Sequence, residues 1–152
     1  MLITDILKIE NIVISTPAQN KNDAIKSLVC FANRNNPTPT DTVDLLIQRE
    51  TKATSGFGKG VAIPSIIHKT IPEIHMSLVI FAKPVDWDSR DGQPVRIACA
   101  VLVASRLFES YRIIMTMIGK ILSDDYIRSS ILNAPNVNEI LSIIKKQEKL
   151  LG

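Results

Sequence analysis

The sequence predicts an α/β fold in which helices cover a mixed sheet of about four or five strands. Two nearly continuous apolar stretches, His75 to Phe81 and Val95 to Val103, are typical of strands buried on both faces of a sheet. On either side of the central region, apolar residues recur at helical spacing. The chain has 152 residues and no internal repeats, so we expect a single domain spanning residues 1–152.

The N-terminal third is predicted as helices around one short strand. Met1 to Leu7 is expected to form a short helical turn, and Asn11 to Ser15 a strand. Asn20 is the expected N-cap of the next helix, which ends before a segment with two prolines. A further helix is expected to begin near Thr40 and to end at Arg49.

The last third is predicted as three helices. Residues 107–122 carry one apolar stripe at helical spacing. Ser123 or Asp124 is expected to cap a second helix, which Pro135 stops. Asn136 is expected to cap the third helix. The turn-rich segment between the two long strands, Ala82 to Pro94, is predicted as a surface connection.

Composition argues against several classes of function. The net charge of +3 is small and the basic residues are scattered, so we expect no nucleic-acid binding. The N-terminus carries acidic residues where a signal peptide has basic ones, and no apolar run is long enough to span a membrane. Cys30 and Cys99 lie among apolar residues and are predicted to be buried free thiols, which fits a reducing cytoplasm. With only two histidines, no metal or other cofactor is expected.

The chemistry is predicted between Arg49 and His68, where a glycine-rich loop leads into a short strand that ends at Pro64. Glycines allow backbone angles and close approaches that side chains forbid, and proline has no N–H to continue a sheet ladder. Ser65 is therefore expected at the end of a strand, beside loop amides that could receive an anion. Arg49 and Lys59 are near enough in sequence to supply charge.

This region resembles the signature of the fructose/mannitol-type IIA domains of the bacterial phosphotransferase system, especially the nitrogen-regulatory IIA protein. In that family a helix ending in Arg-Glu leads through Ser-Thr-Gly-Ile-Gly-Asn-Gly-Ile-Ala-Ile-Pro to a histidine, which takes a phosphoryl group from a phosphocarrier protein. The matching parts here are Arg49 with Glu50, the loop Thr54 to Gly60 and the strand Val61 to Pro64. Val85 to Val95 also resembles the family's linking segment. The resemblance covers nearly the whole chain and implies the IIA mannitol/fructose-like fold.

The resemblance places the family's functional positions on residues of this chain. The acceptor histidine falls on Ser65, and a second, assisting histidine falls on Tyr111, or on Ser110 if the alignment shifts by one residue. His68, three residues beyond Ser65, is a possible displaced acceptor. The phosphate-binding groups implied by the family pattern are Arg49, Ser55, Gly56, Gly58 and Gly60.

Two hypotheses for function follow, and they leave open whether the chain is an enzyme. A serine hydroxyl needs a base to become nucleophilic, and a phosphoserine ester does not pass its phosphoryl group on efficiently. The first hypothesis is a cytoplasmic IIA-like regulator that is not phosphorylated and acts by binding proteins. The alternative is an active IIA phosphocarrier, for regulation or sugar uptake, that uses His68 or Ser65. The implied partners are the phosphocarrier protein and either regulatory targets or a sugar permease component.

Overall fold

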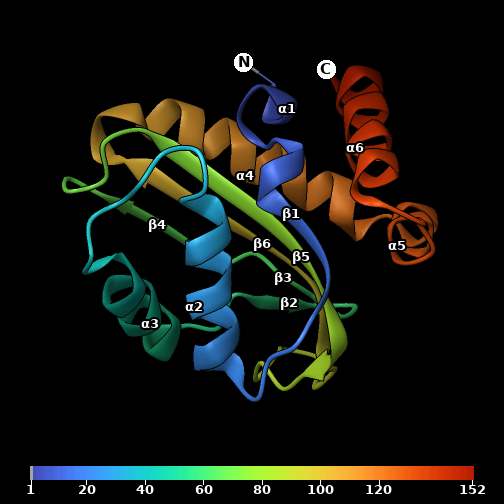
Figure 1. The fold of residues 1–152 in the computed structure, drawn as a ribbon, viewed down its shortest axis with the longest axis horizontal. Helices are drawn as coiled ribbons and strands as arrows, with labels where there is room; N and C mark the ends of the chain where they lie inside the picture. Colours follow the sequence, from blue (N-terminus) through green and yellow to red (C-terminus); the bar gives the residue numbers. More distant parts are fainter. Residues whose placement is uncertain (1) are drawn as a thin grey trace.

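The computed structural model describes residues 2–152. Its centre is a six-stranded mixed sheet with helices on both faces (Figure 1). The strand order is β1-β5-β6-β3-β2, and β4 also pairs with β6. The strands are β1 (Ile12–Thr16), β2 (Gly56–Gly58), β3 (Val61–Ala62), β4 (Ser65–His68), β5 (Ile74–Val85) and β6 (Val95–Ala104). The predicted α/β class with a mixed sheet is thus confirmed.

The helices lie close to their predicted positions. They are α1 (Ile3–Ile6), α2 (Lys21–Ala32), α3 (Thr42–Lys52), α4 (Phe108–Ser123), α5 (Asp125–Leu132) and α6 (Val137–Leu151), with 3-10 turns at Ile9–Asn11 and Ser105–Leu107. The predicted caps Asn20, Asp124 and Asn136 each accept a backbone N–H at the start of a helix. The expected cap at Thr40 is wrong, because α3 begins two residues later, at Thr42.

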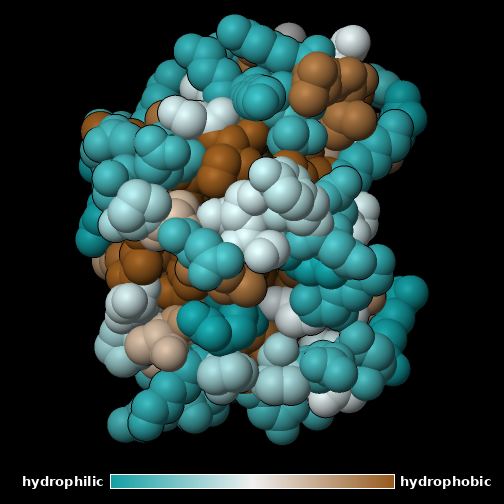
Figure 2. All heavy atoms as spheres, turned by 90° about the vertical axis from the view of Figure 1, so that its right-hand side faces the viewer, coloured by the Kyte–Doolittle hydropathy of each residue, from teal (hydrophilic) through white to brown (hydrophobic). Residues whose placement is uncertain are grey.

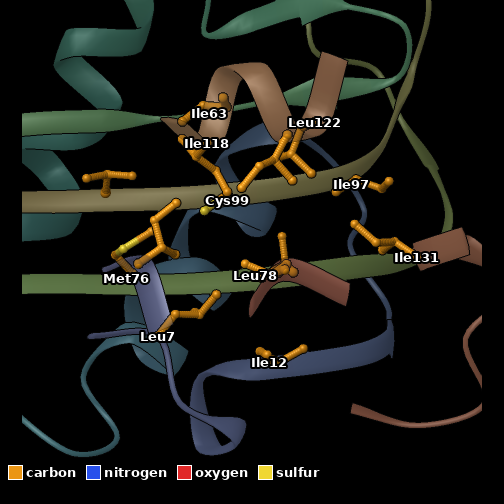
Figure 3. Packing of buried hydrophobic residues seen from close by; sticks show 14 of the residues in the cluster. Leu7, Ile12, Ile63, Met76, Leu78, Ile97, Cys99, Ile118, Leu122 and Ile131 are labelled. Carbon is orange, nitrogen blue, oxygen red and sulfur yellow. The ribbon is translucent and has the colours of Figure 1, made fainter. Parts of the chain in front are cut away.

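Strand β6 divides the core into two layers. Its residues alternate between the two faces of the sheet, as the strand period of two requires. Ile97, Cys99, Val101 and Val103 pack in a cluster with α4, α5 and α6, part of which is shown in Figure 3. Ala98, Ala100 and Leu102 pack in a second cluster with α2 and α3. Because both faces are covered, β6 is apolar at nearly every position, which explains its continuous hydrophobic pattern.

Strands β3 and β4 are two pieces of one interrupted strand that runs parallel to β6. Val61 lies opposite Ile97 and Ser65 lies opposite Val101, so the register is the same on both sides of the interruption. The break falls at Ile63 and Pro64, where proline lacks the N–H that a ladder needs. The expectation that the strand ends at Pro64, with Ser65 at its end, is therefore wrong: Ser65 begins β4, and the sheet has six strands because the chain rejoins β6 after Pro64.

Three other expectations need correction. The segment Ala82 to Pro94 is only partly a surface connection, because β5 continues to Val85 and Trp87 is fully buried. Cys30 is exposed on α2, whereas Cys99 is buried, and burial raises the pKa of its thiol to about 12. The predicted turn Met1 to Leu7 is observed as the helix Ile3–Ile6, and Met1 lies outside the described residues.

His75 is a buried polar residue on β5. Only 2% of its surface is exposed, and within residues 2–152 neither ring nitrogen has a hydrogen-bond partner. Burial lowers the pKa of His75 below its ordinary value of 6.5, and the nearby Asn36 backbone and Glu73 carboxylate oppose this shift. The folded state therefore favours the neutral form of the His75 ring. Protonation of this ring opposes folding.

We expect His75 to make the fold less stable in acid. Since its pKa is lower in the folded state, its contribution is complete above the unfolded value of 6.5 and is lost as the pH falls through the folded pKa. One such group changes the free energy of unfolding by at most about 1.4 kcal/mol per pH unit. Urea unfolding at several pH values should show a smaller acid loss in His75→Leu than in the parent protein.

His68 supplies the control for this measurement. His68→Gln should keep the parental acid loss, because the His68 side chain is only partly buried and its ring is hydrogen-bonded to Thr70. An unchanged slope in His75→Leu would show that other groups control the acid sensitivity.

Candidate functional site

Ser65 and Tyr111 meet across the edge of the sheet. The Ser65 Oγ and the Tyr111 hydroxyl oxygen are 3.0 Å apart and share a hydrogen bond. Ser65 begins β4, and Tyr111 lies in the first turn of α4, so two segments 46 residues apart are joined at this point. The resemblance predicted that these two residues occupy functional positions, and the structure brings them together. Of the two alignments considered, it is Tyr111 rather than Ser110 that faces Ser65.

A cavity of about 260 Å³ opens beside this hydrogen bond. Its walls come from the end of α3, the loop after it, β4 and the first turns of α4. The lining residues are Arg49, Glu50, Ala53, Thr54, Ser55, Phe57, Ile63, Ser65, Tyr111 and Met115. Four of the predicted site residues, Arg49, Ser55, Ser65 and Tyr111, therefore line one cavity. The lining mixes polar side chains such as Arg49 and Ser65 with apolar ones such as Phe57 and Met115, a combination typical of a site that binds a small group.

Glu50 is a buried charged residue in the lining of the cavity. The residue is 6% exposed, and its Oε1 lies 3.0 Å from the Lys21 Nζ. The same oxygen accepts hydrogen bonds from Trp87 Nε1 at 2.7 Å, from the Ser55 N–H at 2.9 Å and from the Ser55 hydroxyl at 2.8 Å. Four donors thus compensate the carboxylate that burial would otherwise penalise.

This network explains why Trp87 is buried within an otherwise polar connection. Its ring lies 5.9 Å from the Lys21 Nζ, and its carbonyl accepts from both that ammonium and the Thr54 hydroxyl. The contacts join α2, the end of α3, the glycine loop and the connection after β5. The position of the cavity wall therefore depends on Glu50 and Trp87.

The sequence reasoning did not assign roles to Lys21 and Trp87, and it treated Glu50 only as part of a helix-end pair. The sequence does contain one signal for this network. Glu50 follows the motif arginine and Trp87 lies in a turn-rich segment, and both side chains have polar atoms that need hydrogen-bond partners when they are buried. The partners themselves lie 29 and 37 residues from Glu50 along the chain, a separation that no local pattern spans.

The glycine loop differs from the expectation that its amides are free to receive an anion. The Ser55 N–H is bonded to Glu50, the Gly56 N–H to the Thr54 hydroxyl at 3.1 Å, and the Lys59 N–H to the Asp91 carboxylate at 2.8 Å. Hydrogen bonds from the backbone N–H groups of Lys59 and Gln93 lower the pKa of Asp91. Side chains of this protein therefore occupy these donors.

The glycines instead shape the loop. Gly58 and Gly60 have φ angles of 107° and 77°, a region that favours glycine. A Cβ at Gly56 would collide with the Ser89 side chain. None of these three glycines lines the cavity beside Ser65. Among the described residues that line this cavity, Arg49 is the one with a basic side chain.

His68 lies outside the cavity. It is at the end of β4, three residues from Ser65, and an odd spacing along a strand places two side chains on opposite faces of a sheet. Its Nδ1 is 2.8 Å from the Thr70 Oγ1, in an exposed position. The structure therefore does not bring His68 together with Ser65, Tyr111 and Arg49.

The arrangement can hold an anion but offers no obvious proton acceptor for group transfer. Arg49 supplies a positive charge, and the Ser65 and Tyr111 hydroxyls can each donate to an oxygen. No histidine lines the cavity among residues 2–152, and the Glu50 oxygen that faces the donors is fully engaged. Such a site suits binding better than nucleophilic attack by a serine.

Comparison with known proteins identifies the family to which this α/β domain belongs. Residues 5–147 match the family model described as "Phosphoenolpyruvate-dependent sugar phosphotransferase system, EIIA 2". The chain therefore belongs to this family, and the predicted resemblance to type-2 IIA domains is confirmed.

Individual relatives fall into two groups. The chain is 27% identical over 148 residues to a nitrogen regulatory protein of Bradyrhizobium diazoefficiens, with 95% of each chain covered. It is 28% identical over 144 residues to a multiphosphoryl transfer protein of Shigella flexneri, covering 93% of this chain but only 17% of that longer protein. The chain thus matches a small part of one relative and nearly the whole of the other.

A solved structure confirms the fold. The nitrogen regulatory protein IIA-Ntr from Neisseria meningitidis superposes with a TM-score of 0.86 at 23% identity, covering 92% of this chain and 97% of that one. Within the part of the chain that the structure describes, no helix combines the length and the apolar character needed to cross a membrane.

The charge on Glu50 is expected to stabilise the fold as well as shape the cavity. Glu50→Gln removes the ion pair with Lys21 and weakens the bonds from Trp87 and Ser55. We expect a loss of about 1.5–3 kcal/mol in the free energy of unfolding, the range for hydrogen bonds to charged groups. Chemical denaturation measures it.

A matched substitution separates this effect from the loss of any glutamate charge. Glu109 is exposed and pairs with Arg112 at 3.0 Å on the surface of α4, so Glu109→Gln should change stability by less than about 0.5 kcal/mol. Equal effects of the two substitutions would contradict the role assigned to Glu50.

Proposed function

We propose that this chain is a regulatory protein of the IIA type that acts by binding partner proteins and does not itself carry a phosphoryl group. The observation that carries the proposal is the hydrogen bond between Ser65 and Tyr111. The resemblance assigns an acceptor histidine and its assistant to these two positions, and here both carry hydroxyl groups. On this proposal the chain keeps the cavity and its arginine but lacks the nucleophile of the family reaction.

The chemistry of the two side chains supports this proposal. A neutral imidazole attacks a phosphoryl group at cellular pH, and the phosphoramidate that it forms transfers the group readily. Serine needs a neighbouring base, and the hydroxyl of Tyr111 is the partner found next to Ser65. Even if an ester formed at Ser65, the phosphoryl group would stay there rather than pass to a second protein. Regulation by binding requires none of these steps.

An apolar surface next to the cavity supports protein docking. Phe108 is 52% exposed and stacks on Tyr111, with the ring centroids 6.3 Å apart. An exposed aromatic side chain beside a polar cavity is typical of a binding surface. We infer that partners dock here with their contacts centred on the start of α4.

The partners follow from the family. The phosphocarrier protein and a regulatory target or sugar permease component are the expected partners in the cytoplasm. A solved complex joins enzyme IIA of the mannitol system to phosphorylated enzyme IIB in Escherichia coli, an interaction between two components of one system. The similarity to nitrogen regulatory proteins in sequence and fold favours a regulatory target for this chain.

The rival function is an active phosphocarrier that uses His68, or Ser65, as acceptor. His68 is partly exposed and its Nδ1 is engaged by Thr70, which leaves Nε2 as the nitrogen that could accept a phosphoryl group. No arginine or hydroxyl of the cavity stands beside it, so this route would lack the charge stabilisation that phosphoryl transfer needs.

Phosphorylation by the family's own donors tests the proposal. The purified protein is incubated with phosphoenolpyruvate, the first enzyme of the system and the phosphocarrier, and its intact mass is measured. We expect no phosphoryl group on the parent protein and one on Ser65→His, or on Ser65→His combined with Tyr111→His. The restored imidazole would then face the same cavity and Arg49.

His68→Asn separates the rival. If the parent protein gains a phosphoryl group that His68→Asn does not, the alternative phosphocarrier is correct and the proposal fails. An acid-stable phosphoryl group on the parent protein would instead identify Ser65 as the acceptor and would equally overturn the proposal.

A further inference from the structure

A second cavity, of about 230 Å³, lies at the far end of α4 from the Ser65 site. Tyr111 and Ser123 are 12 residues apart on this helix, which separates the two sites by about 18 Å along its axis. The cavity is lined by Lys59, Gly60, Pro84, Gln93, Pro94, Arg96, Ile97, Arg128 and Leu132. Two of the contributing segments are helix α5 and the turn that joins β2 to β3. Both lie on the right-hand side of Figure 1, which is the side shown to the viewer in Figure 2.

The charge of this cavity is one-sided. Three of its lining residues are basic, from the β2–β3 turn, from β6 and from α5, and none of the lining residues is acidic. Arg128 pairs with the exposed Asp125. Among residues 2–152, Lys59 and Arg96 have no carboxylate within ion-pair distance. An excess of positive charge thus remains at one concave place in a chain whose net charge is only +3.

Main-chain carbonyls hold the three cations in place. Lys59 Nζ donates to the Ser123 carbonyl at 3.4 Å, Arg128 Nη1 donates to the Leu122 carbonyl at 3.1 Å, and Arg96 Nε donates to the Phe81 carbonyl at 3.0 Å. These contacts leave both terminal amino groups of Arg96 without a partner in the described chain. Fixed guanidinium groups with free N–H donors are suited to binding phosphate oxygens, because little side-chain entropy is lost.

The backbone at Lys59 belongs to the hairpin turn between β2 and β3. Lys59 and Gly60 have φ angles of 61° and 77°, and a two-residue hairpin turn of this type has positive φ at both central residues. Both residues of this turn line the cavity.

We infer that this cavity binds the diphosphate or phosphate group of a small molecule, of the nucleoside-diphosphate class. The free donors of Arg96 and Lys59 supply contacts to phosphate oxygens. Pro84, Pro94 and Leu132 supply an apolar wall for the rest of the molecule. A concave site of this size fits a small molecule better than an acidic protein segment. The inference is independent of whether Ser65 accepts a phosphoryl group.

Titration with pyrophosphate and with ADP tests the inference. Binding is followed by calorimetry and by the backbone and arginine side-chain signals in NMR spectra. We expect both probes to shift the signals of Lys59, Gly60, Arg96 and Arg128, leaving those of Arg49 and Ser65 in place. Lys59→Asn and Arg96→Gln should each weaken binding about tenfold, the loss expected for one charge-assisted contact.

Lys59→Asn keeps the test separate from folding. Asparagine accepts the left-handed backbone more readily, so this variant should melt at a temperature equal to or higher than the parent while losing affinity. Lys145→Gln removes one positive charge from exposed α6 and should bind as the parent does. The inference fails if neither probe binds at millimolar concentration, if the shifts fall on the Ser65 cavity, or if Lys145→Gln weakens binding equally. It also fails if a glutamate-rich peptide binds these residues and the phosphate probes do not.

Discussion

The structure depends on the double-sided burial of β6. A strand with both faces covered must also have its backbone groups paired on both edges, because an unpaired buried N–H or C=O costs about 1–3 kcal/mol. Strand β5 supplies one edge, and the interrupted strand β3–β4 supplies the other. That second edge is where Ser65 sits. Restoring the ladder after Pro64 fixes the register of Ser65 opposite Val101, and the register determines which face its side chain occupies. The position of Ser65 in the site is therefore a consequence of how the backbone N–H and C=O groups of β6 are paired.

Much of this could be predicted from sequence because the relevant signals are local. The continuous apolar run of β6, the helical stripe of α4 and the caps Asn20, Asp124 and Asn136 each arise from neighbouring residues. The glycines at positions 58 and 60 do have the positive φ angles that make glycine necessary. The family pattern added long-range information that periodicity lacks, and it placed Ser65 and Tyr111 at positions that turn out to be in contact.

The rest could not be predicted because it depends on contacts between distant segments. A proline commonly ends a strand, and nothing local shows that β6 recaptures the chain one residue later. The loop amides looked available because their acceptors, Glu50 and Asp91, reach them only in the folded chain. Likewise, Trp87 lies in a segment rich in turn residues, and its Nε1 finds its acceptors, Glu50 Oε1 and Ser55 Oγ, only in the folded chain. In each case a buried polar group found its partner through tertiary structure.

The Glu50 network shows how the shape of the cavity is separated from the identity of the residue at position 65. The cavity wall is held by Lys21, Trp87 and Ser55 around Glu50, and none of these contacts involves Ser65. The small side chain of Ser65 is in turn positioned by Tyr111, whose ring also supports the exposed Phe108. Structure and reactivity are thus carried by different side chains. A surface that partners recognise by shape and charge can remain intact on this scaffold when the chemistry at its centre changes, because the residues that hold the surface together are not the residues that would react.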